Sequence, residues 1–191
     1  YLGRLAGRLD PIMGWLQSMK SRYGDKCFLM LDSGAFTFQQ DPERAQSAEL
    51  DEYVEEYVAF IEEYGSCFDV IAELDVYYPR VIDGVEVLDS MERVRQYRER
   101  LWKAAGSRLM PVLKGNLLTI PECIEICKDV RWKWVAVSSH VADDPIKDLE
   151  IQKTLINIGH TYHKKVHGFA MTRLLTDFKL LYSYDSVDST T

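Results

Sequence analysis

The chain has 191 residues, of which 47% are hydrophobic and 28% are charged, and its formal net charge is −7. Its length and composition are those of an ordinary soluble globular chain with one sizeable core, and no apolar run reaches membrane-spanning length. The negative charge argues against broad, non-specific binding to nucleic acid, because that affinity comes mainly from neutralising phosphates.

The cysteine pattern and the chain ends bear on compartment and extent. The four cysteines have no framework spacing and no signal-peptide pattern is visible, so we expect reduced thiols in a cytoplasmic setting. The chain opens on Tyr1 rather than a methionine and stops at Thr191 in the middle of what resembles a motif. We therefore expect residues 1–191 to be a single domain that is truncated at one or both ends.

The first half of the chain alternates helical and strand-like patterns. The expected elements are helices over residues 1–24 and 50–61, apolar strands over residues 27–31 and 68–75, a polar loop that runs through Gln40 and Pro42, and a loop over residues 76–79. A proline removes a helical hydrogen bond, so we expect a break in the first helix around Asp10-Pro11. The first strand ends in Asp32, Ser33 and Gly34, and the second ends in Asp75.

The second half continues the alternation. The expected elements are helices that begin at the capping boxes Asp89–Glu92 and Thr119–Glu122, strands over residues 109–113, 134–137 and 166–170, and further helices over residues 145–164 and 174–180. The helix after Asp89 carries a dense basic run of arginines, interpreted chiefly as a solvated helix face and alternatively as a contact for phosphates.

Strand and helix alternate about six times at spacings of roughly 30–40 residues, which predicts parallel strands joined by crossover helices. An open doubly wound sheet and a (β/α)8 barrel both fit this α/β pattern. No glycine-rich nucleotide fingerprint follows the first strand, whereas nearly every strand ends in polar or ionisable residues. A barrel assembles its active site from such strand ends, so the sequence favours an incomplete (β/α)8 TIM barrel.

Several carboxylates are expected to converge at the ends of the strands. Like charges repel, so one acid should have a raised pKa and serve as a proton donor, while another stays ionised and acts as nucleophile. This arrangement cleaves glycosidic bonds through a covalent intermediate, although the same acids could bind a divalent metal. The strand-end candidates are Asp32, Asp75, Lys114, Ser138, Ser139, His140, His167, Gly168, Asp185 and Asp188.

Four of these segments resemble the tRNA-guanine transglycosylases. Residues 32–36 resemble the family's Asp-Ser-Gly-Gly-aromatic signature, and residues 68–75 resemble the strand that carries its base-recognising aspartate. Residues 166–169 resemble the family's Met-Gly-Val-Gly turn. Residues 186–190 resemble the segment that carries its nucleophile. The matches occur in family order. The last two segments resemble, more narrowly, the phage and genomic-island branch that inserts 7-deazaguanines into DNA.

The resemblance implies a (β/α)8 barrel that exchanges guanine for a 7-deazaguanine of the preQ0 type in DNA. Asp188 would attack C1′ of the target nucleotide and expel guanine, and Asp32 would move the proton. Asp75 would hydrogen-bond the incoming base, while Phe36 and His167 would stack on its two faces. Ser33, Gly34, Lys114, Ser138, Ser139, His140 and Gly168 would complete the substrate pocket.

The chain also departs from the family pattern. Lys114 stands where the family has glutamine, and Ser138-Ser139 replaces a Gly-Gly turn, so base contacts differ. The tRNA enzymes carry a zinc site of three cysteines and a histidine after the nucleophile, and the resemblance implies such a zinc only in residues absent from this chain. No cofactor is therefore expected within it. The sequence after Asp188 also differs, which favours DNA over tRNA.

The expected partners are single-stranded or base-flipped DNA and a 7-deazaguanine base, in the host cytoplasm if the protein is phage-encoded. Tyr77 and Tyr78 are further candidates for stacking on an extruded base. The alternatives left open are the same exchange on tRNA, a non-catalytic base-binding subunit that partners an active homologue, and a metal-dependent small-molecule enzyme. A homodimer or a partner subunit is compatible with each.

Overall fold

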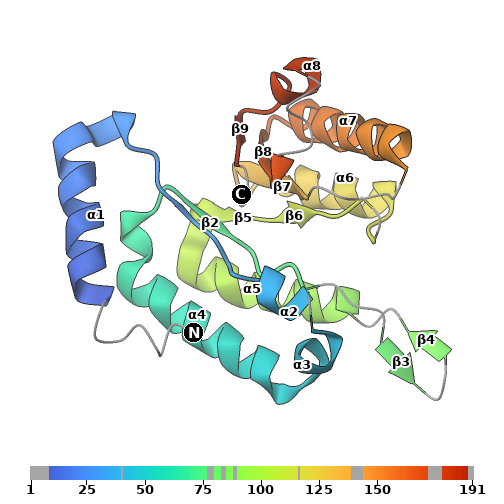
Figure 1. Cartoon of the computed structure of the whole chain (residues 1–191), viewed down its shortest axis with the longest axis horizontal. Coiled ribbons are helices and arrows are strands. Elements are labelled where there is room, and N and C mark those ends of the chain that lie inside the picture. The colour runs from blue at the N-terminus through green and yellow to red at the C-terminus, as the bar shows by residue number, and fades with distance from the viewer. Residues whose placement is uncertain are drawn as a thin grey trace. The chain divides into compact units, whose positions relative to one another are not determined.

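The structure is a computed structural model that describes residues 9–39, 41–76, 80–82, 85–87, 90–115, 117–138, 144–171 and 178–188. The chain divides into two compact units, Tyr1–Leu109 (unit 1) and Met110–Thr191 (unit 2), and each is described by itself. Both combine helices with strands, and the described strands include parallel pairs (Figure 1). The expected α/β class is confirmed.

Unit 1 contains a small sheet and the longest helices of the first half. Its sheet has the strand order β1-β2-β5, where β5 begins at Leu109, the last residue of unit 1, and β1 runs parallel to β2 with Met30 opposite Val70. The elements are α1 (Leu9–Tyr23), β1 (Met30–Leu31), α2 (Phe36–Gln39), α3 (Pro42–Gln46), α4 (Ala48–Tyr64), β2 (Val70–Ala72), β3 (Arg80–Ile82), β4 (Val85–Val87), α5 (Ser90–Ala105) and β5 (Leu109–Met110), with short 3-10 turns at Gly24–Lys26, Gly65–Cys67 and Gly106–Arg108.

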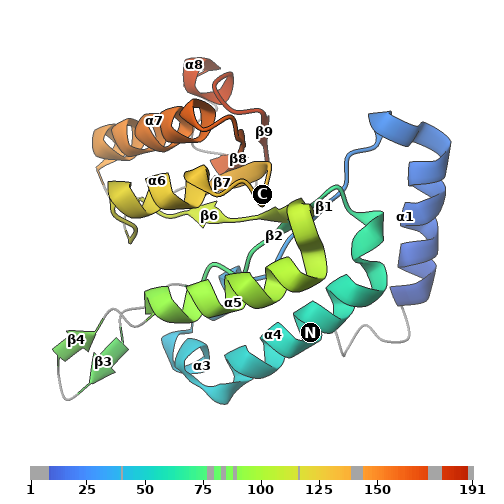
Figure 2. The ribbon, with the colours of Figure 1, turned by 180° about the vertical axis from the view of Figure 1, so that it is seen from behind.

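Helices α4 and α5 lie side by side in unit 1 (Figure 2). Val54 and Ile61 of α4, Leu101 of α5 and Ile71 of β2 are fully buried in one hydrophobic cluster. Ser47 accepts a hydrogen bond from the N–H of Glu49 and so caps the start of α4. Burial of these apolar faces, at about 25 cal/mol per Å² of apolar surface, is the main force that holds the helices against the sheet.

Unit 2 is a four-stranded parallel sheet with helices on one face. Its strand order is β6-β7-β8-β9, so the strands are neighbours in the order in which they occur in the chain. Helices α6 and α7 contact each other, and α7 contacts β7 and β8 (Figure 1). The elements are β6 (Val112–Leu113), α6 (Ile120–Lys128), β7 (Trp134–Ser138), α7 (Pro145–Thr161), β8 (Lys165–Phe169), α8 (Phe178–Leu181) and β9 (Ser186–Val187).

Helix α7 packs on an apolar face of the unit 2 sheet. A Cβ built on Gly159 of α7 would come within 2.6 Å of Val166 and 3.4 Å of Val135, so only a residue without a side chain allows this close approach. The capping box predicted at Thr119 and Glu122 is present at the start of α6. The expected box at Asp89–Glu92 includes Asp89, which lies outside the described residues.

Several local expectations are wrong. The strand expected over residues 109–113 is interrupted at Pro111, which has no N–H for a strand ladder, and forms the separate strands β5 and β6. The polar loop expected to run through Gln40 and Pro42 instead contains the short helix α2 and, from Pro42, the start of α3, and an unpredicted hairpin of β3 and β4 precedes α5. Asp10 and Pro11 lie in the first turn of α1, where proline is tolerated, and the helical stretch expected before them falls on residues 1–8, outside the described residues. The described strands form open sheets.

A buried ion pair links α5 to the end of β2 in unit 1. Arg98 donates from Nε to Glu73 Oε2 at 2.5 Å and from a terminal nitrogen to Glu73 Oε1 at 3.0 Å. The side chains of Arg98 and Glu73 are 9% and 1% exposed. A buried pair of this kind contributes little over apolar packing while it is intact, but removing one partner leaves an uncompensated buried charge.

We expect Arg98→Met to lower the free energy of unfolding by about 3–5 kcal/mol, because Glu73 would stay buried without its partner. Urea denaturation measures the change. The matched control is Arg95→Met on the same helix, where the arginine side chain is 55% exposed. That variant should change the free energy of unfolding by less than about 0.5 kcal/mol. Equal losses in the two variants would contradict the assignment.

Candidate functional site

The ends of the unit 2 strands place several candidate residues in one row. Val137 of β7 lies opposite Leu113 of β6, and Gly168 of β8 lies opposite both Val137 and Val187. The next residue of each strand is therefore Lys114, Ser138, Phe169 and Asp188, all at the carboxyl end of the sheet. Side chains alternate along strands, so this row shares a face with His167 and Ser186, opposite the face that α7 covers.

Asp188 is fixed through its backbone and its carboxylate. Its N–H donates to the carbonyl of Gly168 at 3.1 Å, and its carbonyl accepts from the N–H of Met171 at 3.0 Å. The N–H of Ala170 donates to Oδ1 of Asp188 at 2.5 Å. Ala170 has a φ of +54°, a left-handed conformation that is unusual for a residue with a Cβ. The turn after β8 is thus bent so that two N–H groups reach Asp188.

His167 is the side chain that faces the Asp188 carboxylate. Its side chain is 5% exposed, and Nδ1 lies 2.8 Å from Oγ of Ser186. Nε2 lies 3.7 Å from Oδ2 of Asp188, beyond hydrogen-bond distance. Phe169 contacts the ring edge-on with centroids 4.8 Å apart. Because the ring is covered in this way, the base-stacking role implied for His167 stays a prediction, and its contact with Asp188 is the more direct finding.

The surroundings of Asp188 favour its ionised form. Burial opposes ionisation, but the interaction with His167 and the hydrogen bond from Ala170 outweigh it, so the pKa of Asp188 is lowered from its ordinary value of 3.8. The side chain is 39% exposed. A carboxylate that is ionised at neutral pH, oriented by the backbone and open to solvent has the properties required of a nucleophile.

Gly168 is required by packing on the other face of β8. A Cβ at this position would come within 2.8 Å of Met171 and 3.1 Å of Tyr184. Tyr184 is buried, and its hydroxyl donates to Oε1 of Gln152 at 2.9 Å. Burial, followed by the nearby Asp148, raises the pKa of Tyr184 well above its ordinary value. Gly168 therefore allows Met171 and Tyr184 to pack closely against β8, and no described contact assigns it to a ligand.

The turn after β1 holds the second candidate acid. Asp32 is exposed, whereas Ser33 is buried and its carbonyl accepts a hydrogen bond from the hydroxyl of Tyr53 at 2.8 Å. Gly34 has a φ of +67°, and a Cβ there would come within 2.8 Å of the Tyr53 hydroxyl. Burial, followed by the carboxylates of Asp32 and Glu56, raises the pKa of Tyr53 to about 12. Tyr53 thus anchors the turn that presents Asp32.

The end of β2 holds the third candidate acid in a more protected position. Asp75 is 8% exposed and lies three residues beyond β2. Tyr57 of α4 donates from its hydroxyl to the carbonyl of Ala72 at 2.9 Å, which ties the strand end to the helix. Phe36, in contrast, is 66% exposed at the start of α2. Its ring is therefore available for stacking.

The structure brings together only part of the predicted constellation. Asp188, His167, Gly168, Ser138 and Lys114 lie along the strand ends of unit 2, and Lys114 is 7% exposed. The remaining described candidates, Asp32, Ser33, Gly34, Phe36 and Asp75, lie in unit 1. Convergence of the two sets on one purine-sized pocket stays a prediction. Ser139, His140, Tyr77 and Tyr78 lie outside the described residues.

Three residues that position the candidate site were not predicted from the sequence, namely Ser186, Ala170 and Tyr53. Ser186 stands two residues before Asp188, so strand alternation places both on one face, and this signal could have identified it. Asp185, which competed with Asp188 for the nucleophile role, accepts hydrogen bonds from the N–H of Val166 at 2.8 Å and pairs with His160. It therefore lies on the helix-covered face and has a structural partner.

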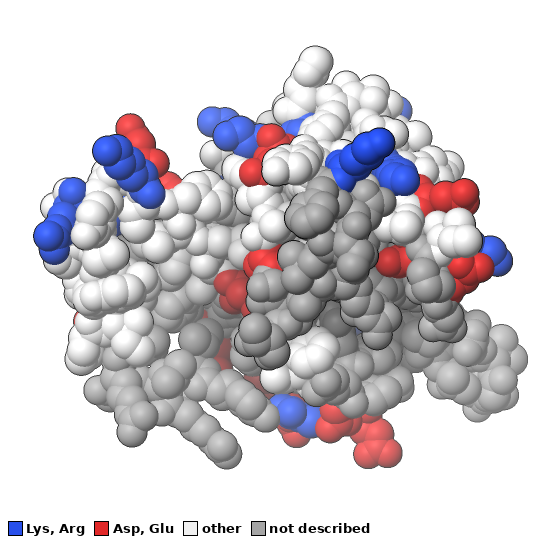
Figure 3. Space-filling view, turned by 45° about the horizontal axis from the view of Figure 1, so that its top comes forward, with Lys and Arg blue, Asp and Glu red and all other residues white. Residues whose placement is uncertain are grey.

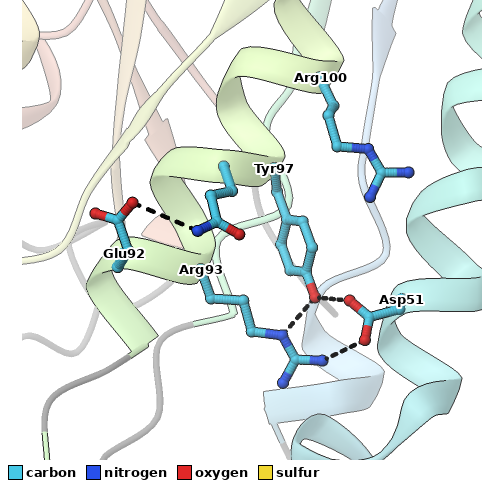
Figure 4. A pocket seen from close by; sticks show the side chains of 6 residues that line it. Asp51, Glu92, Arg93, Tyr97 and Arg100 are labelled. Atoms are coloured by element: carbon cyan, nitrogen blue, oxygen red, sulfur yellow. Dashed lines mark hydrogen bonds and ion pairs between the residues drawn. The ribbon is translucent and has the colours of Figure 1, made fainter.

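A surface pocket of about 330 Å³ lies between α4 and α5 in unit 1 (Figure 4). Tyr97 donates to Oδ1 of Asp51 at 2.5 Å and accepts from Arg93 Nε, and Arg93 also donates to Asp51 Oδ2 at 3.0 Å. Burial and the bond to Asp51 outweigh Arg93 and raise the pKa of Tyr97 to about 12. These groups bind each other, so the pocket is best interpreted as a contact between helices.

The basic run on α5 is largely neutralised by carboxylates. Arg93 pairs with Asp51, Arg98 with Glu73 and Arg100 with Glu55. On the face drawn in Figure 3, the coloured basic and acidic side chains are interspersed. A phosphate-binding surface is therefore disfavoured, but the run is not uniformly a solvated face, because Arg98 is buried in its pair with Glu73, and the arginines serve mainly to join α5 to its neighbours.

Comparison of the chain with models of known protein families, with curated proteins and with solved structures finds no match. Within the described part of the chain, no group of three or more histidine, cysteine, aspartate or glutamate side chains is arranged to hold a metal ion. A search of the same residues finds no helix with the length and apolar character needed to cross a membrane. The site is accordingly interpreted from its own geometry.

We expect Gly34→Ala to destabilise the protein by about 1–2 kcal/mol, because alanine disfavours the left-handed conformation and its methyl group would displace Tyr53. Urea denaturation measures the change. Gly14→Ala is the matched control, since Gly14 lies within α1 and a Cβ there meets nothing within 4 Å. It should stabilise the protein by up to about 1 kcal/mol. Destabilisation by both substitutions would show that the turn at Gly34 has no special requirement.

The lowered pKa of Asp188 predicts a pH dependence of stability. A carboxyl whose pKa is lower in the folded than in the unfolded chain contributes stability above its unfolded pKa, and this contribution is lost as the pH falls through the folded value. The difference in unfolding free energy between the wild type and Asp188→Asn should therefore shrink as the pH falls below 3.8. Urea denaturation over a series of pH values measures it, and a difference that widens instead would overturn this interpretation.

Proposed function

We propose that this protein is a base-exchange transglycosylase, which replaces guanine in DNA with a 7-deazaguanine through a covalent aspartyl intermediate. The observation that carries the proposal is the state of Asp188. This carboxylate lies at the carboxyl end of a parallel sheet, is held by the N–H of Ala170, is 39% exposed and has a lowered pKa. The resemblance of residues 32–36 and 186–190 to the transglycosylases assigns the nucleophile to the same residue.

The proposed reaction proceeds in two displacements. In the first, an oxygen of Asp188 forms a bond to C1′ of the target nucleotide, the bond from C1′ to N9 breaks, and the departing guanine takes a proton from Asp32. In the second, N9 of the 7-deazaguanine bonds to C1′ and gives its proton to Asp32, and the aspartyl ester breaks to restore the Asp188 carboxylate. Atoms, charge and protons balance over the cycle.

The other candidates would bind the exchanged base. Phe36 is exposed, which suits an aromatic surface that catches an extruded base. Asp75 is mostly buried, which suits a carboxylate that reads the ring through hydrogen bonds in a protected setting. Lys114 and Ser138 lie in the same strand-end row as Asp188 and would contact the base or a phosphate. Ser33 and Gly34 would shape the turn beside Asp32, and Ser139 and His140 would extend the pocket.

We further propose that the strands belong to a (β/α)8 barrel. In an open doubly wound sheet the strand order reverses at a switch point, whereas in a barrel each strand lies beside the next in sequence. Of the three described sheets, β6-β7-β8-β9 follows the second pattern, and β1-β2-β5 follows it if the antiparallel hairpin of β3 and β4 is taken as an insertion after β2. The polar row at the carboxyl ends in unit 2 also suits the position of a barrel active site.

The test is formation of a covalent adduct between the full-length protein and single-stranded DNA, detected on a denaturing gel, together with incorporation of a labelled 7-deazaguanine. We expect both activities in the wild type and neither in Asp188→Asn, since an amide cannot form the ester. The matched control is Glu150→Gln, an exposed acid on α7, which should retain both.

Absence of incorporation in the wild type, with Asp188→Asn and Glu150→Gln behaving identically, would count against the proposal. Incorporation into tRNA in direct competition with DNA would assign the same chemistry to tRNA. Base binding without an adduct, together with full activity of a complex in which Asp32 and Asp188 are replaced, would identify a non-catalytic partner subunit.

A further inference from the structure

The Nε2 atom of His167 is a buried polar atom without a hydrogen-bond partner in the described part of the protein. A buried polar group left unpaired costs about 1–3 kcal/mol, so such atoms are rare without a functional reason. The atom points at Asp188, with Oδ2 3.7 Å away. We infer that His167 is a positioning residue for Asp188, which presents an N–H to the carboxylate and stabilises it as the leaving group of the covalent intermediate.

Ser186 can hydrogen-bond His167 in each of its protonation states, because a hydroxyl both donates and accepts. Its Oγ lies 2.8 Å from Nδ1. When the imidazole is neutral and Ser186 donates to Nδ1, the hydrogen is on Nε2, and when the imidazole is charged both nitrogens carry one. The other neutral form would turn the Nε2 lone pair towards the Asp188 carboxylate, which is repulsive. In both favourable states an N–H is therefore directed at Asp188.

The ring has little freedom to turn away. His167 and Ser186 are paired residues in the register of β8 and β9, and Phe169 contacts the ring edge-on. The other charged side chains near His167 do not contact Asp188 in any described interaction. Asp185 and His160 pair with each other on the helix-covered face, and Lys114 lies two strands away at the end of β6. His167 is thus the titratable side chain of the described residues that contacts Asp188.

This role rests on the proposed function, because it concerns the second displacement. An N–H directed at the carboxylate favours the free carboxylate over the ester, in which the negative charge is lost. Stabilising that product makes Asp188 a better leaving group and a weaker nucleophile. His167 should therefore speed the breakdown of the covalent adduct more than its formation.

The test uses variants that separate the two nitrogens of the imidazole. His167→Phe keeps a ring but removes both, His167→Asn keeps a group that can reach Ser186, and His167→Gln places an amide N–H close to the position of Nε2. We expect the covalent adduct with single-stranded DNA to persist about tenfold longer in the Phe and Asn variants than in the wild type. The Gln variant should restore most of the wild-type lifetime.

A second measurement does not depend on turnover. The pKa of Asp188, followed by NMR of its carboxyl carbon, should rise in His167→Phe and His167→Asn and remain lowered in His167→Gln. Ser186→Ala, a mild substitution, should raise it partway, because the hydroxyl that can donate to Nδ1 when the hydrogen is on Nε2 is removed. Far-ultraviolet circular dichroism checks that each variant is folded. If His167→Phe does not fold, Ser186→Ala still tests the inference.

The outcomes separate the inference from the proposed function. An unchanged pKa of Asp188 in His167→Asn and Ser186→Ala would overturn the inference, whether or not the protein exchanges bases. A raised pKa in these variants, with no adduct in the wild type, would keep the contact between His167 and Asp188 while rejecting base exchange. Equal shortening of adduct lifetime in all four variants would also contradict the assigned role.

Discussion

Pairing of β8 with β9 is the interaction on which the candidate site depends. Strand β9 has two residues, so its register is held mainly by hydrogen bonds at its ends, from Asp185 to Val166 and from Asp188 to Gly168. This register places Ser186 beside His167 and brings the Asp188 carboxylate to the N–H of Ala170. A shift by one residue would turn Asp188 to the helix-covered face. The position of the acid is therefore a property of strand pairing.

The sequence predicted the parts that depend on local patterns. Alternation of strands and helices, the cap at Thr119 and the acids that follow β1 and β2 are all set by short-range periodicity and turn chemistry. The hairpin of β3 and β4 was missed, although Asp83-Gly84 between two short β-branched runs is a typical hairpin signal. The interruption of the strand at Pro111 could also have been predicted from the sequence, because proline cannot donate a hydrogen bond to a neighbouring strand.

Features that depend on distant partners could not be read from the sequence. The arginines of α5 look like a phosphate-binding run in isolation, yet Arg93 and Arg100 pair with carboxylates of α4 more than 40 positions earlier. Likewise, nothing near His167 in the sequence indicates that its ring meets Asp188, because this contact arises from a parallel pairing across a separation of about 20 residues. Tertiary contacts of this kind decide what a charged side chain does.

The three acids differ in exposure in a way that matches different tasks. Asp32 is exposed and Asp188 is 39% exposed, so both carboxylates can meet a substrate, whereas Asp75 is 8% exposed. In the two accessible cases the backbone is anchored, by Tyr53 to the carbonyl of Ser33 and by Met171 to the carbonyl of Asp188. A reacting group needs an open carboxylate on a fixed backbone, while a group that reads a base gains strength from removal of water. Exposure alone therefore separates the acids proposed for chemistry from the one proposed for recognition.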